Sequence, residues 1–86
     1  MITLSYELHL GDNLIDVPNG GRPNAVLPTA AGALLVLVTC DPDEPTTTQR
    51  VIVQPLGEVV NLSVSRLVGY GPVGGVLCHV FWGGEV

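Results

Sequence analysis

Three carboxylates close together in the sequence, at Asp41, Asp43 and Glu44, are of the type that binds hard cations such as Ca²⁺. A calcium loop needs glycine at its sixth position and glutamate at its twelfth, but the sixth position here is Thr46 and the twelfth is not glutamate. The cluster is therefore predicted to be a solvated turn, because acidic residues and prolines are both common in turns. Arg50, which follows, is expected to pair with this acidic loop.

A glycine pattern, Gly69, Gly71 and Gly74, matches by letter the G-x-G-x-x-G of dinucleotide-binding folds. In those folds the glycines let a pyrophosphate approach the N-terminus of a helix. Here Pro72 interrupts the pattern, and the segment that follows, Val76 to Trp82, is typical of a strand. Without the helix the phosphate site has no basis, so a hairpin turn is predicted instead.

Two cysteines and two histidines, Cys40, Cys78, His9 and His79, could in principle form a zinc site, a disulfide or a nucleophile with its base. Zinc sites usually contain a close pair of cysteines, which is missing here. A disulfide is conceivable if the cysteines lie on neighbouring strands, although two buried reduced thiols are expected. Cys78 and His79 are adjacent on one strand and should point to opposite faces. We therefore predict no catalytic, cofactor-binding or metal-binding residue, and no enzyme activity.

The charge balance restricts the partners. Eight acidic residues against three arginines and no lysine give a net charge of −5, which does not favour nucleic acid or anionic lipid. The uncharged stretch at residues 23–40 is interrupted by Pro28 and Gly32, and it is too short to cross a membrane as a helix. The first residues lack the pattern of a secretion signal, so synthesis inside the cell is expected.

Length and composition favour one small β domain over residues 1–86. Of the 86 residues 47% are hydrophobic, with many β-branched side chains, and 11 glycines and 7 prolines divide the chain into short segments. Gly11 to Asn13 is predicted to close a hairpin between the first two strands. Ala33 to Cys40 is predicted to be a central strand buried on both faces. The preceding segment, Ala25–Thr29, is predicted to be an edge strand because it contains Pro28.

The remaining strands are read from alternating or short apolar runs. The predicted strands are Ile2–Leu10, Leu14–Val17, Ala25–Thr29, Ala33–Cys40, Arg50–Gln54 and Val76–Trp82, and two weaker strand-like stretches lie around Glu58–Asn61 and Ser63–Val68. We therefore predict an all-β fold, a compact β-sandwich or partly open β-barrel of about six to seven short antiparallel strands.

The apolar excess of so small a chain predicts a surface that meets a protein partner. Of the aromatic pair near the end, Phe81 is expected in the core and Trp82 at the interface. The residues predicted to form this interface are Trp82, Tyr70, Pro72, Arg22 and Arg50.

Several segments together resemble a family of small phage and prophage proteins that is frequent in phages of actinobacteria and is defined as a domain of unknown function. The residues that carry the resemblance are Tyr6, Glu7, Leu8, Val17, Pro18, Gly20, Pro23, Asp41, Pro42, Pro45, Thr46, Arg50, Gly69, Tyr70, His79, Val80 and Phe81. The chain departs from the family in lacking a tryptophan in the central strand and a Thr-Gly-His segment near residues 56–58. The resemblance implies a phage source and no particular activity.

These observations lead to two expectations about function. The first is a virion structural protein, a minor capsid or decoration (cement) protein, made in the host cytoplasm, that binds the major capsid protein, itself as a homo-oligomer, or both. The alternative is an early phage protein that binds a host protein and inhibits a host enzyme or an anti-phage defence factor. Neither requires a cofactor.

Overall fold

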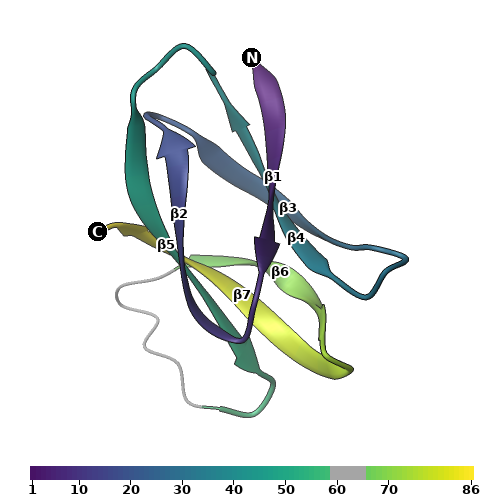
Figure 1. The fold of residues 1–86 in the computed structure, drawn as a ribbon. Coiled ribbons are helices and arrows are strands. Elements are labelled where there is room, and N and C mark those ends of the chain that lie inside the picture. The colour runs from purple at the N-terminus through teal and green to yellow at the C-terminus, as the bar shows by residue number, and fades with distance from the viewer. Residues whose placement is uncertain (59–65) are drawn as a thin grey trace.

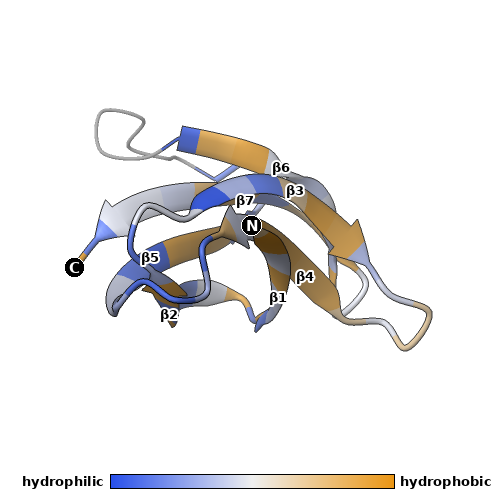
Figure 2. Ribbon diagram, turned by 90° about the horizontal axis from the view of Figure 1, so that it is seen from above, coloured by the Kyte–Doolittle hydropathy of each residue, from blue (hydrophilic) through white to orange (hydrophobic). Residues whose placement is uncertain are grey.

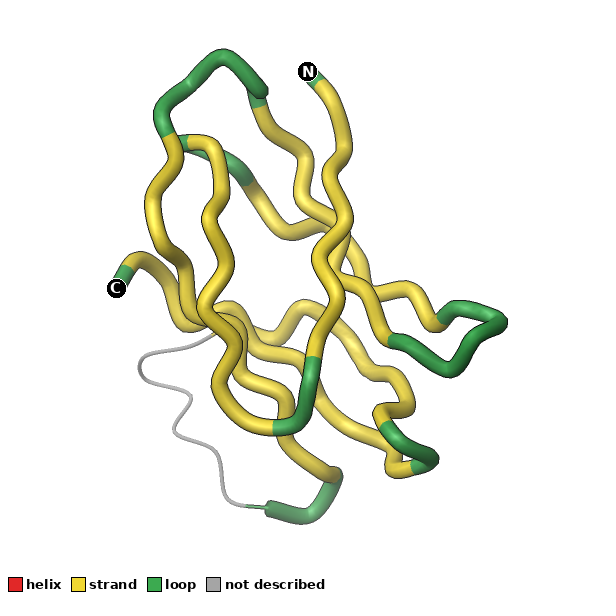
Figure 3. Tube along the Cα trace, viewed as in Figure 1, coloured by secondary structure: helices red, strands yellow, loops and turns green. Residues whose placement is uncertain are grey.

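The computed structural model describes residues 1–58 and 66–86, and all regular secondary structure in these ranges is β-strand (Figures 1 and 3). The strands are β1 (Ile2–Leu8), β2 (Gly11–Pro18), β3 (Arg22–Pro28), β4 (Leu34–Cys40), β5 (Thr46–Pro55), β6 (Arg66–Val73) and β7 (Val76–Glu85). Among these residues there is no helix long and apolar enough to cross a membrane. The predicted strand Glu58–Asn61 lies almost entirely outside the described residues.

The strands form two antiparallel sheets, one with the order β1-β4-β3 and one with the order β2-β5-β7-β6. No ladder between described residues joins the two sheets, so the fold is an open sandwich and not a closed barrel. The all-β prediction is therefore confirmed, and of its two architectures the sandwich is the one observed.

The core lies between the sheets and consists mainly of valines. Its buried members are Leu8, Ile15, Val17, Leu34, Val36, Val38, Val51, Val53, Cys78 and Val80. Strands β2, β4, β5 and β7 contribute alternate residues, as expected where only one face of a sheet is covered.

Strand β4 shows where the prediction of burial on both faces was wrong. It is the central strand of its sheet and almost entirely apolar (Figure 2), but only Leu34, Val36, Val38 and Cys40 are buried. The alternate residues, among them Leu35 and Leu37, are half-exposed. The reason is that the three-stranded sheet is covered on one face only, so an apolar run does not by itself show two covered faces. The edge position predicted for Ala25–Thr29 is confirmed, because β3 ends the three-stranded sheet.

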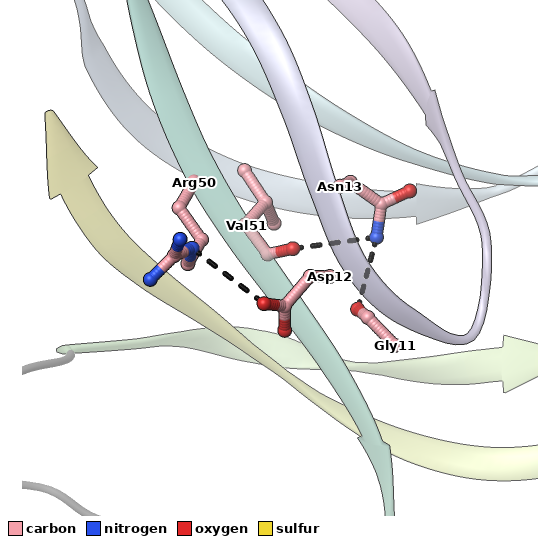
Figure 4. Close-up of polar contacts among 5 residues, drawn as sticks. All are labelled: Gly11, Asp12, Asn13, Arg50 and Val51. Carbon is pink, nitrogen blue, oxygen red and sulfur yellow. Dashed lines mark hydrogen bonds and ion pairs between the residues drawn. The ribbon is translucent and has the colours of Figure 1, made fainter. Parts of the chain in front are cut away.

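The predicted hairpin between the first two strands was also wrong. β1 pairs with β4 and β2 pairs with β5, so the chain passes from one sheet to the other between Leu8 and Gly11. The buried side chain of Asn13 fixes this corner (Figure 4). Its Oδ1 accepts a hydrogen bond from the His9 amide at 2.9 Å, and its Nδ2 donates to the carbonyls of His9, Gly11 and Val51 at 2.9, 3.2 and 3.3 Å. The amide thus satisfies backbone groups that a two-stranded hairpin ladder would otherwise pair.

The glycine-rich segment forms the hairpin that its sequence predicted. Gly74 and Gly75, at φ +58° and +80°, make the turn between β6 and β7. Gly69 and Gly71 have a different role, because they lie in β6 and face the other sheet. A Cβ on Gly69 would lie 2.8 Å from Val26 Cγ2, and one on Gly71 would collide with Leu34. These glycines therefore allow β6 to approach β3 and β4 closely.

Candidate interaction surface

The outward face of the four-stranded sheet, called the outer face below, carries large apolar side chains. The cross-strand register directs Leu14, Leu67, Tyr70 and Leu77 away from the core, and Leu67 and Tyr70 share this side because the register shifts between Leu67 and Gly69. Their exposed fractions are 60%, 43%, 54% and 52%. They come from β2, β6 and β7, so side chains far apart in the sequence share one surface.

An aromatic row crosses the middle of the outer face. Tyr70 is the register partner of His79, and their ring centroids lie 5.7 Å apart with the rings tilted by 39°. The His79 ring stacks on Phe81 at 5.2 Å and 26°. The predicted burial of Phe81 is confirmed, with 3% of its surface exposed, although its alternation with Val80 places it on the outer side of the sheet. The row thus gives the surface a rigid aromatic centre with Tyr70 as its exposed end.

Two polar atoms lie beneath this surface without hydrogen-bond partners in the described part of the chain, Gln54 Oε1 and His79 Nε2. Gln54 and His79 are register partners on β5 and β7. Because Cys78 faces the core and His79 faces outward, the cysteine and the imidazole lie on opposite sides of the sheet, as predicted. The structure therefore forms no Cys–His pair here.

The outer face also carries an ion pair between Arg50 Nε and Asp12 Oδ2, at 3.6 Å (Figure 4). The prediction that Arg50 pairs with the loop Asp41–Glu44 was wrong. Arg50 lies four residues into β5, and at about 3.3 Å per residue this places it roughly 13 Å from the loop. The loop is instead stabilised by its own hydrogen bonds. The Asp43 amide donates to Asp41 Oδ1 at 3.0 Å, and the Glu44 amide donates to the Asp41 carbonyl at 3.2 Å.

Three of the five residues predicted to form an interface lie on the outer face, although Arg50 is on β5 and the other two are on β6. Tyr70, Pro72 and Arg50 are exposed on the outer face. Arg22 is exposed on β3 in the other sheet, and Trp82 is half-buried and packs against the core. Whether any of the five contacts a partner stays a prediction.

Sequence reasoning missed the exposed leucines of the outer face. Leu14 alternates with the buried Asn13 and Ile15, and Leu77 precedes the buried Cys78. The period-two pattern could have identified them, but only once the core-facing side of each strand was known. In an apolar strand the two sides are hard to tell apart from sequence.

The two cysteines are free and buried, at the end of β4 and within β7. They lie in different sheets, so the idea that they could sit on neighbouring strands was wrong. Burial raises the pKa of the Cys78 thiol, and its Sγ lies 3.3 Å from the carbonyl oxygen of Val76, to which it donates. Cys78 is therefore a protonated core side chain. Within residues 1–58 and 66–86 no cluster of three or more His, Cys, Asp or Glu side chains could hold a metal ion.

The chain was compared with protein families, curated proteins and solved structures. No family model, no curated protein and no solved structure matches the chain.

Proposed function

We propose that this chain is a non-enzymatic binding protein that docks on a protein partner through the outer face of its four-stranded sheet. The observation that carries the proposal is the exposure of Leu14, Leu67, Tyr70 and Leu77 around a row of stacked rings. Tyrosine is enriched among interface hot spots, and the exposed leucines beside it would exclude water from such a contact.

The partner we propose is the major capsid protein of a phage, with the chain acting as a decoration (cement) protein in the virion. The resemblance to a phage family supports a phage source. A protein that strengthens a shell needs a rigid scaffold and a contact surface, and it needs no catalytic group. The sandwich supplies the scaffold, since its core is closely packed and its sheets are held by antiparallel ladders.

Mass spectrometry of gradient-purified phage particles tests this proposal. Copy number is measured relative to the major capsid protein. A decoration protein is expected at a copy number comparable with that of the capsid subunit, and it should leave the particles only when the shell is disrupted. Absence of the chain from purified particles would overturn the virion proposal.

A second function, inhibition of a host enzyme or defence factor, has one observation in its favour. The residues Asp41–Glu44 are all exposed and project an acidic turn from a chain of net charge −5. Such a turn could occupy a basic site on a host protein. Affinity purification from infected cells, with an Asp41→Asn/Asp43→Asn/Glu44→Gln variant as the matched control, should return one stoichiometric host protein with the wild type alone. Equal recovery with both would rule out a role for the turn.

A further inference from the structure

Within residues 1–58 and 66–86 the sandwich has four edge strands, and they differ in how well they are protected. β1 and β3 end the three-stranded sheet, and β2 and β6 end the four-stranded sheet. An edge strand presents unpaired amides and carbonyls that can pair with another strand, and natural proteins usually block this with prolines, bulges or charges. Three of the four edges here carry a proline, a bulge or two charges.

Strands β3 and β6 are protected by proline and by irregular pairing. β3 contains Pro23 and Pro28 and has a register shift between Pro23 and Ala25. β6 contains Pro72 and has a shift between Leu67 and Gly69. These two edges also pack against each other across the sandwich.

Strand β2 is protected by charge. Asp12 and Asp16 both lie on its outward side, and Pro18 ends it. If two copies of β2 paired antiparallel about Leu14, Asp12 of one copy would stand opposite Asp16 of the other. Like charges directly opposite each other destabilise a strand pair.

Strand β1 has no proline and no bulge, and it carries a single charge. Its register with β4 runs unbroken from Ile2 to Leu8. Glu7 is its one charged residue, and Ile2 on its apolar side is 42% exposed. Among the described residues β4 is the one strand that pairs with β1, so the opposite edge of β1 is open. The Tyr6 hydroxyl donates to the carbonyl of Asp16 at 2.9 Å and holds this open edge in a fixed place.

We propose that β1 pairs antiparallel with β1 of a second copy of this chain, with the two-fold axis at Ser5. This register places Ile2 opposite Leu8 and Leu4 opposite Tyr6, so the apolar sides coincide. Each Glu7 faces Thr3 of the other copy, which keeps the two carboxylates apart. The result is one continuous six-stranded sheet in the order β3-β4-β1-β1-β4-β3.

The sequence of β1 selects this register over its neighbours. An axis between two residues would place apolar side chains opposite polar ones, because a shift by one residue reverses the face. An axis at Leu4 or Tyr6 keeps the faces but leaves two residues of each strand unpaired. The axis at Ser5 pairs all seven residues of β1. The pairing uses no residue of the outer face, so it is independent of the docking proposed above.

The test is the mass of the full chain in solution by analytical ultracentrifugation. The wild type is expected as a dimer, and its Kd should fall as salt is raised, because each copy has a net charge of −5 and salt screens their repulsion. A wild type that stays monomeric up to millimolar concentration would overturn the proposal.

Charge variants at the axis test the register. Ser5 is exposed, so Ser5→Lys and Ser5→Asp should fold, yet each places two like charges face to face and should be monomeric. An equimolar mixture of the two should form a heterodimer. Leu27→Lys, at the opposite edge of the same sheet and 48% exposed, is the matched control and should remain dimeric. If Ser5→Lys dimerises like the wild type, the proposed edge is not the interface.

Amide exchange gives a second readout on the unmodified chain. The outward amides of β1 should become protected from exchange as the protein concentration rises, while those of β2 should not. Concentration-dependent protection in β2 instead of β1 would also contradict the proposal.

Discussion

The two faces of the four-stranded sheet are built from different side chains. The inner face carries Val17, Val51, Val53 and Val80, all almost fully buried, and the glycines of β6 bring the opposite sheet close to it. The outer face carries stacked rings and half-exposed leucines. Large rings usually fill cores, where they bury most area. Here Tyr70 and Phe81 lie on the side of the sheet that faces away from the valine core, and Tyr70 is 54% exposed. We infer that the side chains of the inner face stabilise the fold and that those of the outer face bind a partner.

If this division is correct, inner-face substitutions should cost stability and outer-face substitutions should cost binding. The largest loss is expected for Asn13→Ala, because it leaves the backbone groups of the β1–β2 corner without partners. Leaving the buried carbonyl of Val51 and the partly buried backbone groups of His9 unsatisfied should lower the free energy of unfolding by about 3 kcal/mol. Urea denaturation measures the loss. Asp12→Ala, the adjacent outward residue, is the control, and an equal loss in both variants would contradict the role of the amide.

The next largest effect is expected for Gly71→Val, because its side chain would collide with Leu34. Overpacking of this kind should destabilise the protein by about 2 kcal/mol. The neighbouring exposed Pro72→Ala should change stability by no more than about 0.5 kcal/mol. Thermal unfolding of both variants distinguishes the faces, and a harmless Gly71→Val would show that the sheets are not held at their closest approach by this glycine.

Asn13 and Gly71 also show what the sequence could and could not predict. Alternation and turn residues predicted most strands, because period two and Gly-Pro punctuation are local signals. They did not predict that the turn after Leu8 leads to another sheet, since that depends on hydrogen bonds from Asn13 to residues as distant as Val51. They also did not separate the turn glycines from Gly69 and Gly71, whose role depends on Val26 and Leu34 across the sandwich. The exposed leucines of the outer face were not predicted either, because the side of each strand that faces the core also depends on contacts between the two sheets.

Stability should also fall at alkaline pH through the inner face. Burial raises the pKa of the Cys78 thiol above its ordinary value of 9.0, so the folded chain holds this proton more tightly than the unfolded chain. The stability from this group is complete below pH 9.0 and decreases as the pH rises through the raised pKa. Unfolding curves from pH 8 upward should show a smaller decrease in Cys78→Ala. An identical pH dependence in the two proteins would show that the thiol does not contribute.

The smallest effect on stability is expected for the ion pair of the outer face. Arg50 and Asp12 have side chains that are 46% and 62% exposed. Exposed pairs contribute less than about 1 kcal/mol, so Arg50→Gln should hardly change the melting temperature. The double-mutant cycle with Asp12→Asn measures the coupling directly. A coupling well above this limit would mean that the outer face also serves stability.

If the chain is the decoration protein proposed above, the most direct test of the division between the two faces is the association of purified variants with phage particles that lack it. Tyr70→Ala/Leu77→Ala removes two exposed side chains of the outer face, and Leu27→Ala, on the other sheet, removes one of similar exposure. We predict that wild type and Leu27→Ala co-sediment with the particles, while the double variant stays in the supernatant with an unchanged melting temperature. A double variant that co-sediments as well as the wild type would contradict the assignment of the outer face to recognition.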